Sequence, residues 1–102
     1  MEKIEKLLAF LKDSPDDAFL NHALALEYIK SGQDAPALQL FIEILTRDPD
    51  YIGSYYHLAG LLERNGDREG ALSWYEKGMA AAGRKGDQHA LNELRSVYED
   101  LI

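Results

Sequence analysis

Hydrophobic residues in this chain recur every three or four positions, the spacing that gathers them on one face of an α-helix. Four stretches show this pattern clearly, and they are centred on Leu24, Phe41, Leu58 and Tyr75. Breaker residues separate them. Gly32 and Gly66 can adopt the left-handed conformation that stops a helix, and Pro49 ends the second stretch because proline cannot continue the hydrogen-bond ladder. The pattern therefore predicts two helical hairpins.

The two predicted hairpins repeat one another with a period of 34 residues. Aligning residues 18–51 with residues 52–85 gives five identical pairs, which are Leu24/Leu58, Ala25/Ala59, Gly32/Gly66, Ala37/Ala71 and Leu38/Leu72. Phe41 and Tyr75 form a conservative pair at the same spacing. Because a small side chain lets two helices approach closely, we expect the paired alanines at helix crossings. A fixed period of this length is typical of helical solenoids.

Seventeen residues remain on each side of the two repeats, and each remainder carries one amphipathic stretch. The stretch from about Glu2 to Lys12 takes the place of a second hairpin helix without its first, since Ser14-Pro15 lies one period before Asp48-Pro49. The stretch from about Asp87 to Leu101 takes the place of a first helix without its second. We therefore expect six helices and no sheet, with Asp34 capping the helix that follows Gly32.

Charge and composition narrow the classes of function. The 102-residue chain has a formal net charge of -7, which argues against nucleic acid and acidic membrane surfaces as ligands, because both are bound through clustered Lys and Arg. It contains no cysteine, so disulfides and thiolate metal sites are excluded. The longest unbroken apolar run, Leu7 to Leu11, is too short to cross a bilayer or to form a signal-peptide core. We expect a single-domain cytoplasmic protein.

The repeated residues resemble the tetratricopeptide repeat, whose units combine a Leu-Ala step, a turn glycine, an alanine, an aromatic residue and a closing proline. This resemblance covers nearly the whole chain and implies an all-α, right-handed helical-hairpin solenoid of about six antiparallel helices. Its parts would be a half repeat (1–17), two full repeats (18–51 and 52–85) and a capping helix (86–102). The chain departs from the family pattern at Asn21, Gly78 and Gly83, where the family often has Trp, Ala and Pro. We expect Gly78 to weaken its helix and the second repeat to be less tightly packed.

The resemblance also implies a working surface, because in similar proteins the first helices of successive repeats line a concave groove that receives a peptide or protein segment. In this chain such a groove has an apolar centre with charge at one end. Its residues are Phe19, His22, Leu26, Ile29 and Lys30 from the first repeat, and Gly53, Tyr56, Gly60, Glu63 and Arg64 from the second. Two interpretations stay open. The surface holds a ligand, or it is covered by the end helices or by neighbours in an oligomer.

Some members of the family grip an acidic chaperone tail with a carboxylate clamp of Lys and Asn side chains. This chain does not keep that pattern, because His22, Leu26 and His57 stand at clamp positions. A more apolar target, such as a helix, fits the groove better.

Catalytic and metal chemistry find little support. His22 and His57 lie on neighbouring first helices with Glu63 nearby, but no histidine pair has the i, i+4 spacing that places two imidazoles on one helical face. No Ser or Thr lies in a nucleophile-elbow context, and no Gly-rich phosphate loop occurs. We predict a non-enzymatic protein without metal or cofactor.

The first predicted helix offers a second contact surface. Its apolar residues exceed what one neighbouring helix can cover, and they are Ile4, Leu7, Leu8, Phe10 and Leu11. Phe10 either folds over the first repeat as a cap or belongs to a self-association surface, with a possible homodimer as the result. The leading hypothesis is an adaptor or scaffold that binds a peptide segment of another protein. The alternative is a self-assembling unit that uses the same apolar surfaces, and a fragment of a longer repeat array would show the same internal pattern.

Overall fold

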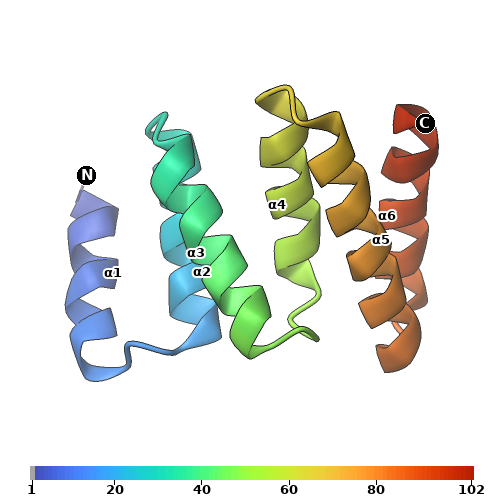
Figure 1. The fold of residues 1–102 in the computed structure, drawn as a ribbon. Helices are drawn as coiled ribbons and strands as arrows, with labels where there is room; N and C mark the ends of the chain where they lie inside the picture. The colour runs from blue at the N-terminus through green and yellow to red at the C-terminus, as the bar shows by residue number, and fades with distance from the viewer. Residues whose placement is uncertain (1) are drawn as a thin grey trace. The chain divides into compact units, whose positions relative to one another are not determined.

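The computed structural model describes residues 2–102, and the regular secondary structure in this range is entirely α-helical. The helices are α1 (Glu2–Asp13), α2 (Ala18–Lys30), α3 (Asp34–Arg47), α4 (Gly53–Arg64), α5 (Arg68–Lys85) and α6 (Gln88–Leu101), coloured from blue to red in Figure 1. The expectation of six helices and no sheet is confirmed over the described residues. Both end helices lie within one residue of their expected limits.

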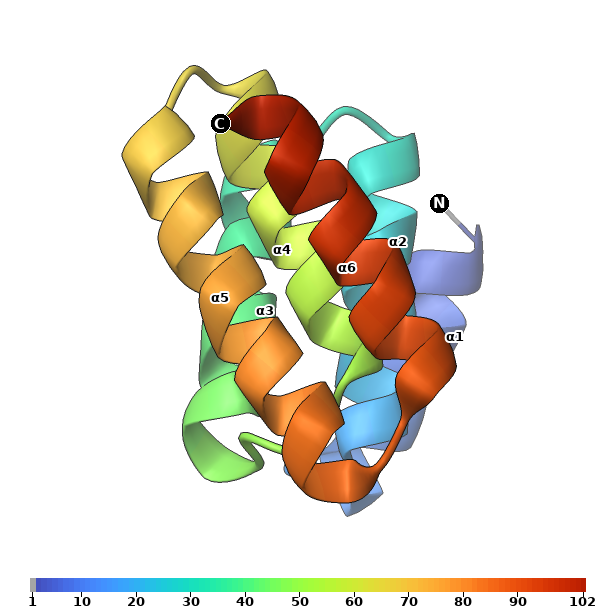
Figure 2. The ribbon, with the colours of Figure 1, turned by 90° about the vertical axis from the view of Figure 1, so that its right-hand side faces the viewer.

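The helices form two compact units. The first ends at Asp48 and contains α1, α2 and α3, and the second runs from Pro49 to Ile102 and contains α4, α5 and α6. Within each unit successive helices run antiparallel and pack side by side (Figure 1). Figure 2 shows this for α5 and α6 of the second unit. α3 ends directly before Asp48-Pro49, as the proline predicts.

The turns inside the two hairpins have the expected conformation, because Gly32 and Gly66 have φ angles of +78° and +87°. The expectation that Asp34 caps α3 is wrong. The cap position is Gln33, whose side chain makes no capping hydrogen bond, and Asp34 is the first residue of the helix. One period later Asp67 occupies the cap position of α5, and its carboxylate accepts a 2.9 Å hydrogen bond from the Gly70 amide. In each hairpin a single residue, Gln33 or Asp67, lies between the turn glycine and the next helix.

α5 is about one turn longer than α3, with 18 residues against 14. It continues through Gly83 because a glycine, unlike the proline that is common there, has the amide needed to extend the helix. The helix ends at Gly86, which has a φ of +69°. The extra turn carries Arg84 to the loop before α4, where its guanidinium lies 2.9 Å from a carboxylate oxygen of Asp50.

The buried residues follow the repeat. The paired alanines are fully buried, as expected of residues at helix crossings, and they are Ala25, Ala37, Ala59 and Ala71. The large buried side chains of the first unit include Leu24 and Phe41, and those of the second include Leu58 and Tyr75. The stripes found in the sequence are therefore the core faces of α2 to α5.

Gly78 does not loosen the second unit as we had expected. A Cβ atom added at this position would lie 2.7 Å from Cβ of Tyr55 and 3.1 Å from Cδ1 of Leu94. Tyr55 belongs to α4 and Leu94 to α6, so the missing side chain lets both helices approach α5 closely. A glycine lowers the intrinsic stability of a helix by about 1 kcal/mol, but at this position it permits α4 and α6 to pack closely against α5.

Candidate protein-binding surfaces

The first candidate surface lies on α2. Phe19, Leu26 and Ile29 project from one side of this helix at helical spacing, and the Phe19 side chain is 70% exposed while the other two are half-buried. The start of the helix is fixed by Asp17, whose carboxylate accepts a 2.9 Å hydrogen bond from the Leu20 amide. The exposed phenyl ring is therefore presented from a well-capped first turn.

Two other predicted groove residues of α2 are engaged within the first unit. The imidazole of His22 meets the ring of Phe41 edge-on, with 5.5 Å between the ring centroids. Nζ of Lys30 lies 3.2 Å from Oε2 of Glu27. His22 is thus half-buried against α3 and contributes to packing, whereas the exposed Lys30 pair is weak and its ammonium can turn to a ligand.

The second candidate surface lies on α4. Tyr56 is 44% exposed, and its ring stands nearly perpendicular to that of His57, with centroids 5.7 Å apart. One turn further along the helix, Gly60 leaves open space, since an added Cβ would have no neighbour within 4 Å. Arg64 is exposed at the end of the helix, and Gly53 is exposed at its beginning. The surface thus combines an aromatic ring, an open floor and a charged end.

Glu63, also predicted for the groove, has a structural partner. One of its carboxylate oxygens accepts a 3.1 Å, partly buried hydrogen bond from the hydroxyl of Tyr75. Burial first, and then the negative charge and hydrogen bond of Glu63, raise the pKa of Tyr75 well above its ordinary value. Glu63 therefore links the exposed side of α4 to the core of the second unit.

A hollow of about 370 Å³ lies between α4 and α6, beside Tyr56. Its walls are formed by Ile52, Gly53, Tyr56, His57, Ala90, Glu93 and Leu94. Burial lowers the pKa of His57, so its imidazole is neutral at pH 7. Sequence reasoning identified Tyr56 and Gly53 here but missed the residues from α6, because that helix fits the repeat register loosely and was assigned only to capping.

The residues expected to form a self-association surface on α1 divide into three groups. Ile4 is buried and therefore belongs to the core of the first unit instead. Leu7 and Leu11 are half-buried, while Leu8 and Phe10 are exposed, the latter at 61%. A second hollow, of about 310 Å³, lies between α1 and α2 and is lined by Lys3, Lys6, Leu7, Phe10, Ala23 and Glu27.

Within residues 2–102 no group of three or more His, Asp or Glu side chains is arranged to hold a metal ion. Over the same range, no helix has the length and apolar character required to cross a membrane.

Helical hairpins with a 34-residue period, turn glycines and buried paired alanines define a helical-repeat protein. The sequence profile of the tetratricopeptide repeat matches residues 1–54. A TPR repeat-containing protein of Pseudomonas aeruginosa is 30% identical over 101 residues, which cover 99% of this chain and 93% of that protein. The chain therefore belongs to the tetratricopeptide repeat family.

Solved structures agree with this assignment. The solution structure of a tetratricopeptide repeat domain protein from Salinibacter ruber is 39% identical, with a TM-score of 0.82 over 85% of this chain and 88% of that one. The solution structure of a Bordetella parapertussis protein is 34% identical, with a TM-score of 0.82 over 96% of this chain and 85% of that one. The fold class is an all-α helical repeat solenoid. Domains of this family are in general non-enzymatic modules for protein-protein interaction.

Proposed function

We propose that this chain is an adaptor or scaffold that binds a peptide segment of another protein in the groove implied by the family resemblance. In this proposal each repeat offers its own contact surface, on α2 in the first unit and on α4 in the second. The observation that carries it is the exposure of Phe19 and Tyr56, two aromatic side chains on first helices of the repeats. Aromatic side chains are enriched in the cores of protein interfaces relative to the rest of the protein surface.

The binding energy would come from covering these apolar side chains, at about 25 cal/mol per Å² before the cost of ordering the ligand. On α2 the contact would involve Phe19, Leu26 and Ile29, together with His22, whose ring packs against Phe41. On α4 it would involve Tyr56 and the open space at Gly60. Lys30, Glu63 and Arg64 would fix the direction of the peptide by pairing with its polar groups.

The hollow beside Tyr56 indicates the kind of side chain that the second unit would accept. Ile52 and Leu94 give it apolar walls, neutral His57 adds no positive charge, and Glu93 supplies one carboxylate. A Lys or Arg side chain fits this hollow, because its aliphatic stem can contact the apolar walls while its cationic end pairs with the Glu93 carboxylate. The net charge of -7 also favours a basic partner segment.

Affinity capture from a lysate of the source cell, followed by mass spectrometry, tests this proposal. The bait proteins are the unaltered chain, a Phe19→Ala, Tyr56→Ala double variant, and Phe10→Ala as a matched control. The control also removes an exposed aromatic ring, but from α1. A protein captured by the unaltered chain and the control, but not by the double variant, supports the proposal. Capture of the same proteins by all three baits contradicts it.

A second candidate function is self-assembly into a homodimer or larger oligomer. The observation that favours it is the exposure of Leu8 and Phe10 on α1, where one helix bears two large apolar side chains in contact with solvent. Light scattering over a range of concentrations tests this candidate. A monomer mass at the highest concentration excludes it, and a mass that falls to that of a monomer in Phe10→Asp supports it.

A further inference from the structure

The 34-residue period assigns each residue of α1 an equivalent on α3 and on α5. Leu7 corresponds to Phe41 and Tyr75, and Phe10 corresponds to Ile44 and Gly78. All four equivalents on α3 and α5 are buried. On α1, by contrast, Leu7 is half-buried and Phe10 is 61% exposed. The same helix face is therefore covered in two copies and open in the third.

In both covered copies an α-helix of the same unit contacts this face. In the first unit the His22 ring of α2 lies against Phe41 of α3. In the second unit Tyr55 of α4 lies against Gly78, and Glu63 of α4 accepts the hydrogen bond of Tyr75. The repeat thus uses these positions to hold an antiparallel helix, and the equivalent face of α1 has the register to hold one as well.

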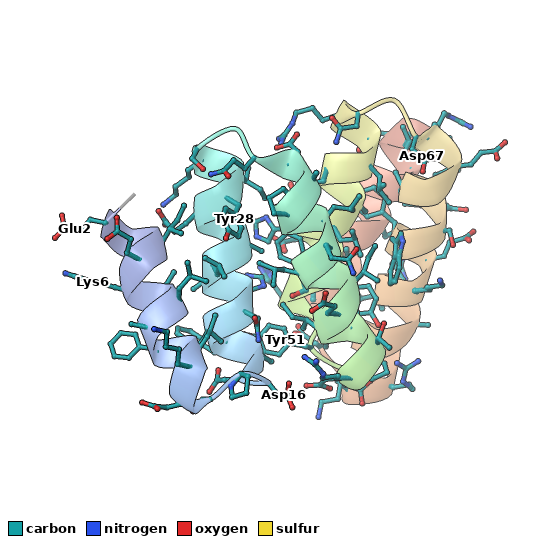
Figure 3. The ribbon with its side chains drawn as sticks, turned by 60° about the vertical axis from the view of Figure 1, so that its left-hand side comes forward. Glu2, Lys6, Asp16, Tyr28, Tyr51 and Asp67 are labelled. Atoms are coloured by element: carbon teal, nitrogen blue, oxygen red, sulfur yellow. The ribbon has the colours of Figure 1, made fainter. Side chains whose placement is uncertain are left out.

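The hollow between α1 and α2 has the surface that such a helix needs. Leu7, Phe10 and Ala23 provide apolar contact, and the small side chain of Ala23 permits close approach to α2. Its volume of about 310 Å³ suits a few side chains of a docked helix. Figure 3 shows Lys6 extending from α1 into solvent near Glu2, and their ion pair is long, at 3.8 Å.

Charge indicates the chemistry of the partner. Lys3 and Lys6 line the hollow in a chain whose net charge is -7, so a positive rim stands out against an acidic protein. Glu27 also lines the hollow and forms a weak, exposed pair with Lys30 at 3.2 Å, so the lining carries two lysines against one carboxylate. Acidic residues beside the apolar stripe of a docking helix would complement the two lysines.

A second copy of this chain does not offer a suitable helix in α6. α6 has the place of a first helix in the repeat, and its residues at the positions of Leu24, Ala25 and Tyr28 are Asn92, Glu93 and Ser96. These three residues are polar and exposed. At these three positions α6 therefore does not repeat the apolar residues of α2.

From the register, the apolar floor and the positive rim we propose that the hollow between α1 and α2 docks an amphipathic, acidic α-helix of another protein. Its apolar stripe would cover Leu7, Phe10 and Ala23, and its carboxylates would face Lys3 and Lys6. The residues that line this hollow do not include Phe19 or Tyr56, the aromatic residues of the proposed peptide groove.

Fluorescence anisotropy with the full chain and two labelled, stapled helical peptides tests the site. Both peptides carry the sequence of residues 17–31, the helix that covers α3 in this chain. Positions 19, 26 and 29 are replaced by Glu in one peptide and by Lys in the other. The apolar residues at positions 24, 25 and 28 are the same in both, so the two peptides differ only in charge. We expect the acidic peptide to bind about tenfold more tightly at low salt, ~1.4 kcal/mol, and this preference to shrink as salt is added.

Variants of the chain locate the binding. Phe10→Asp should abolish peptide binding, and Phe10→Ala should weaken it. Because Phe10 is exposed, neither substitution should unfold the chain, and circular dichroism checks this. The double variant Lys3→Glu, Lys6→Glu should reverse the preference between the two peptides. Tyr56→Ala, on α4 of the second unit, should change nothing, and this control separates a failure here from a failure of the proposed peptide groove.

Three results would overturn the proposal. They are the lack of saturable binding by either peptide, binding that persists unchanged in Phe10→Asp, and equal affinity of the two peptides at low salt. Sedimentation of the chain alone adds a further check. A dimer that dissociates in Phe10→Asp would show that a second copy fills the site in place of a partner helix.

Discussion

Asn21 and Tyr55, which lie 34 residues apart, each donate a side-chain hydrogen bond to the carbonyl of a proline six residues earlier. Asn21 bonds to Pro15 through Nδ2 at 3.0 Å, and Tyr55 bonds to Pro49 through its hydroxyl. The two prolines are also one period apart. This position of the repeat therefore fastens the loop that precedes the first helix, and side chains of different chemistry perform the same task.

Replacing Asn21 should destabilise the first unit. Its amide also donates to the Asp17 carbonyl at 2.9 Å, and both bonds are partly buried. Asn21→Ala leaves these carbonyls without their partner, so we expect a loss of about 1–3 kcal/mol in the free energy of unfolding, measured with urea. Asn92→Ala, at an exposed position of α6, is the control. Equal unfolding midpoints for the two variants would contradict the fastening role.

Two glycines of α5 should respond in opposite directions to the same substitution. Gly78→Ala gains about 1 kcal/mol of helix propensity, but the new methyl group collides with Tyr55 and Leu94. We expect a net loss of roughly 1–3 kcal/mol, as is usual for overpacking. Gly83→Ala meets no atom within 4 Å and should stabilise the protein by up to about 1 kcal/mol. Thermal unfolding decides this, and a higher melting temperature for Gly78→Ala would refute the close packing.

Stability should fall below neutral pH because of His57. Burial lowers its pKa in the folded protein from the ordinary value of 6.5. The unfolded chain therefore binds a proton first as the pH falls, so stability is full above pH 6.5 and decreases from there down to the folded pKa. Urea unfolding between pH 5 and 8 should show a smaller decrease in His57→Gln than in the unaltered chain. His89→Gln, which changes an exposed imidazole, should keep the full decrease.

The ion pair between Arg84 and Asp50 should contribute little, despite its 2.9 Å distance. About half of each side chain is exposed to solvent, so we expect Arg84→Ala to cost less than about 1 kcal/mol. High salt should remove the difference between this variant and the unaltered chain. A larger, salt-independent loss in urea unfolding would mean that Arg84 contributes packing.

The groove ligand, the cytoplasmic location and the homodimer stay predictions.

For the candidate sites, the sequence located the helices that bear Phe19 and Tyr56, because helical periodicity assigns a side chain to a face. It did not distinguish the exposed Phe19 from His22, which packs on Phe41. It also missed Lys3 and Ala23 as neighbours in one hollow, because they belong to different helices.

By itself, the sequence determined the six helices, their turns and the family, because amphipathic spacing, turn glycines and prolines act over a few neighbouring residues. Only the tertiary structure decided the role of Gly78. Local propensity counts a helical glycine as a loss, whereas its benefit arises from Tyr55 and Leu94, which belong to other helices. The burial of Ile44 and the exposure of its equivalent on α1, Phe10, were decided in the same way, since the cover of a helix face depends on which helix packs against it.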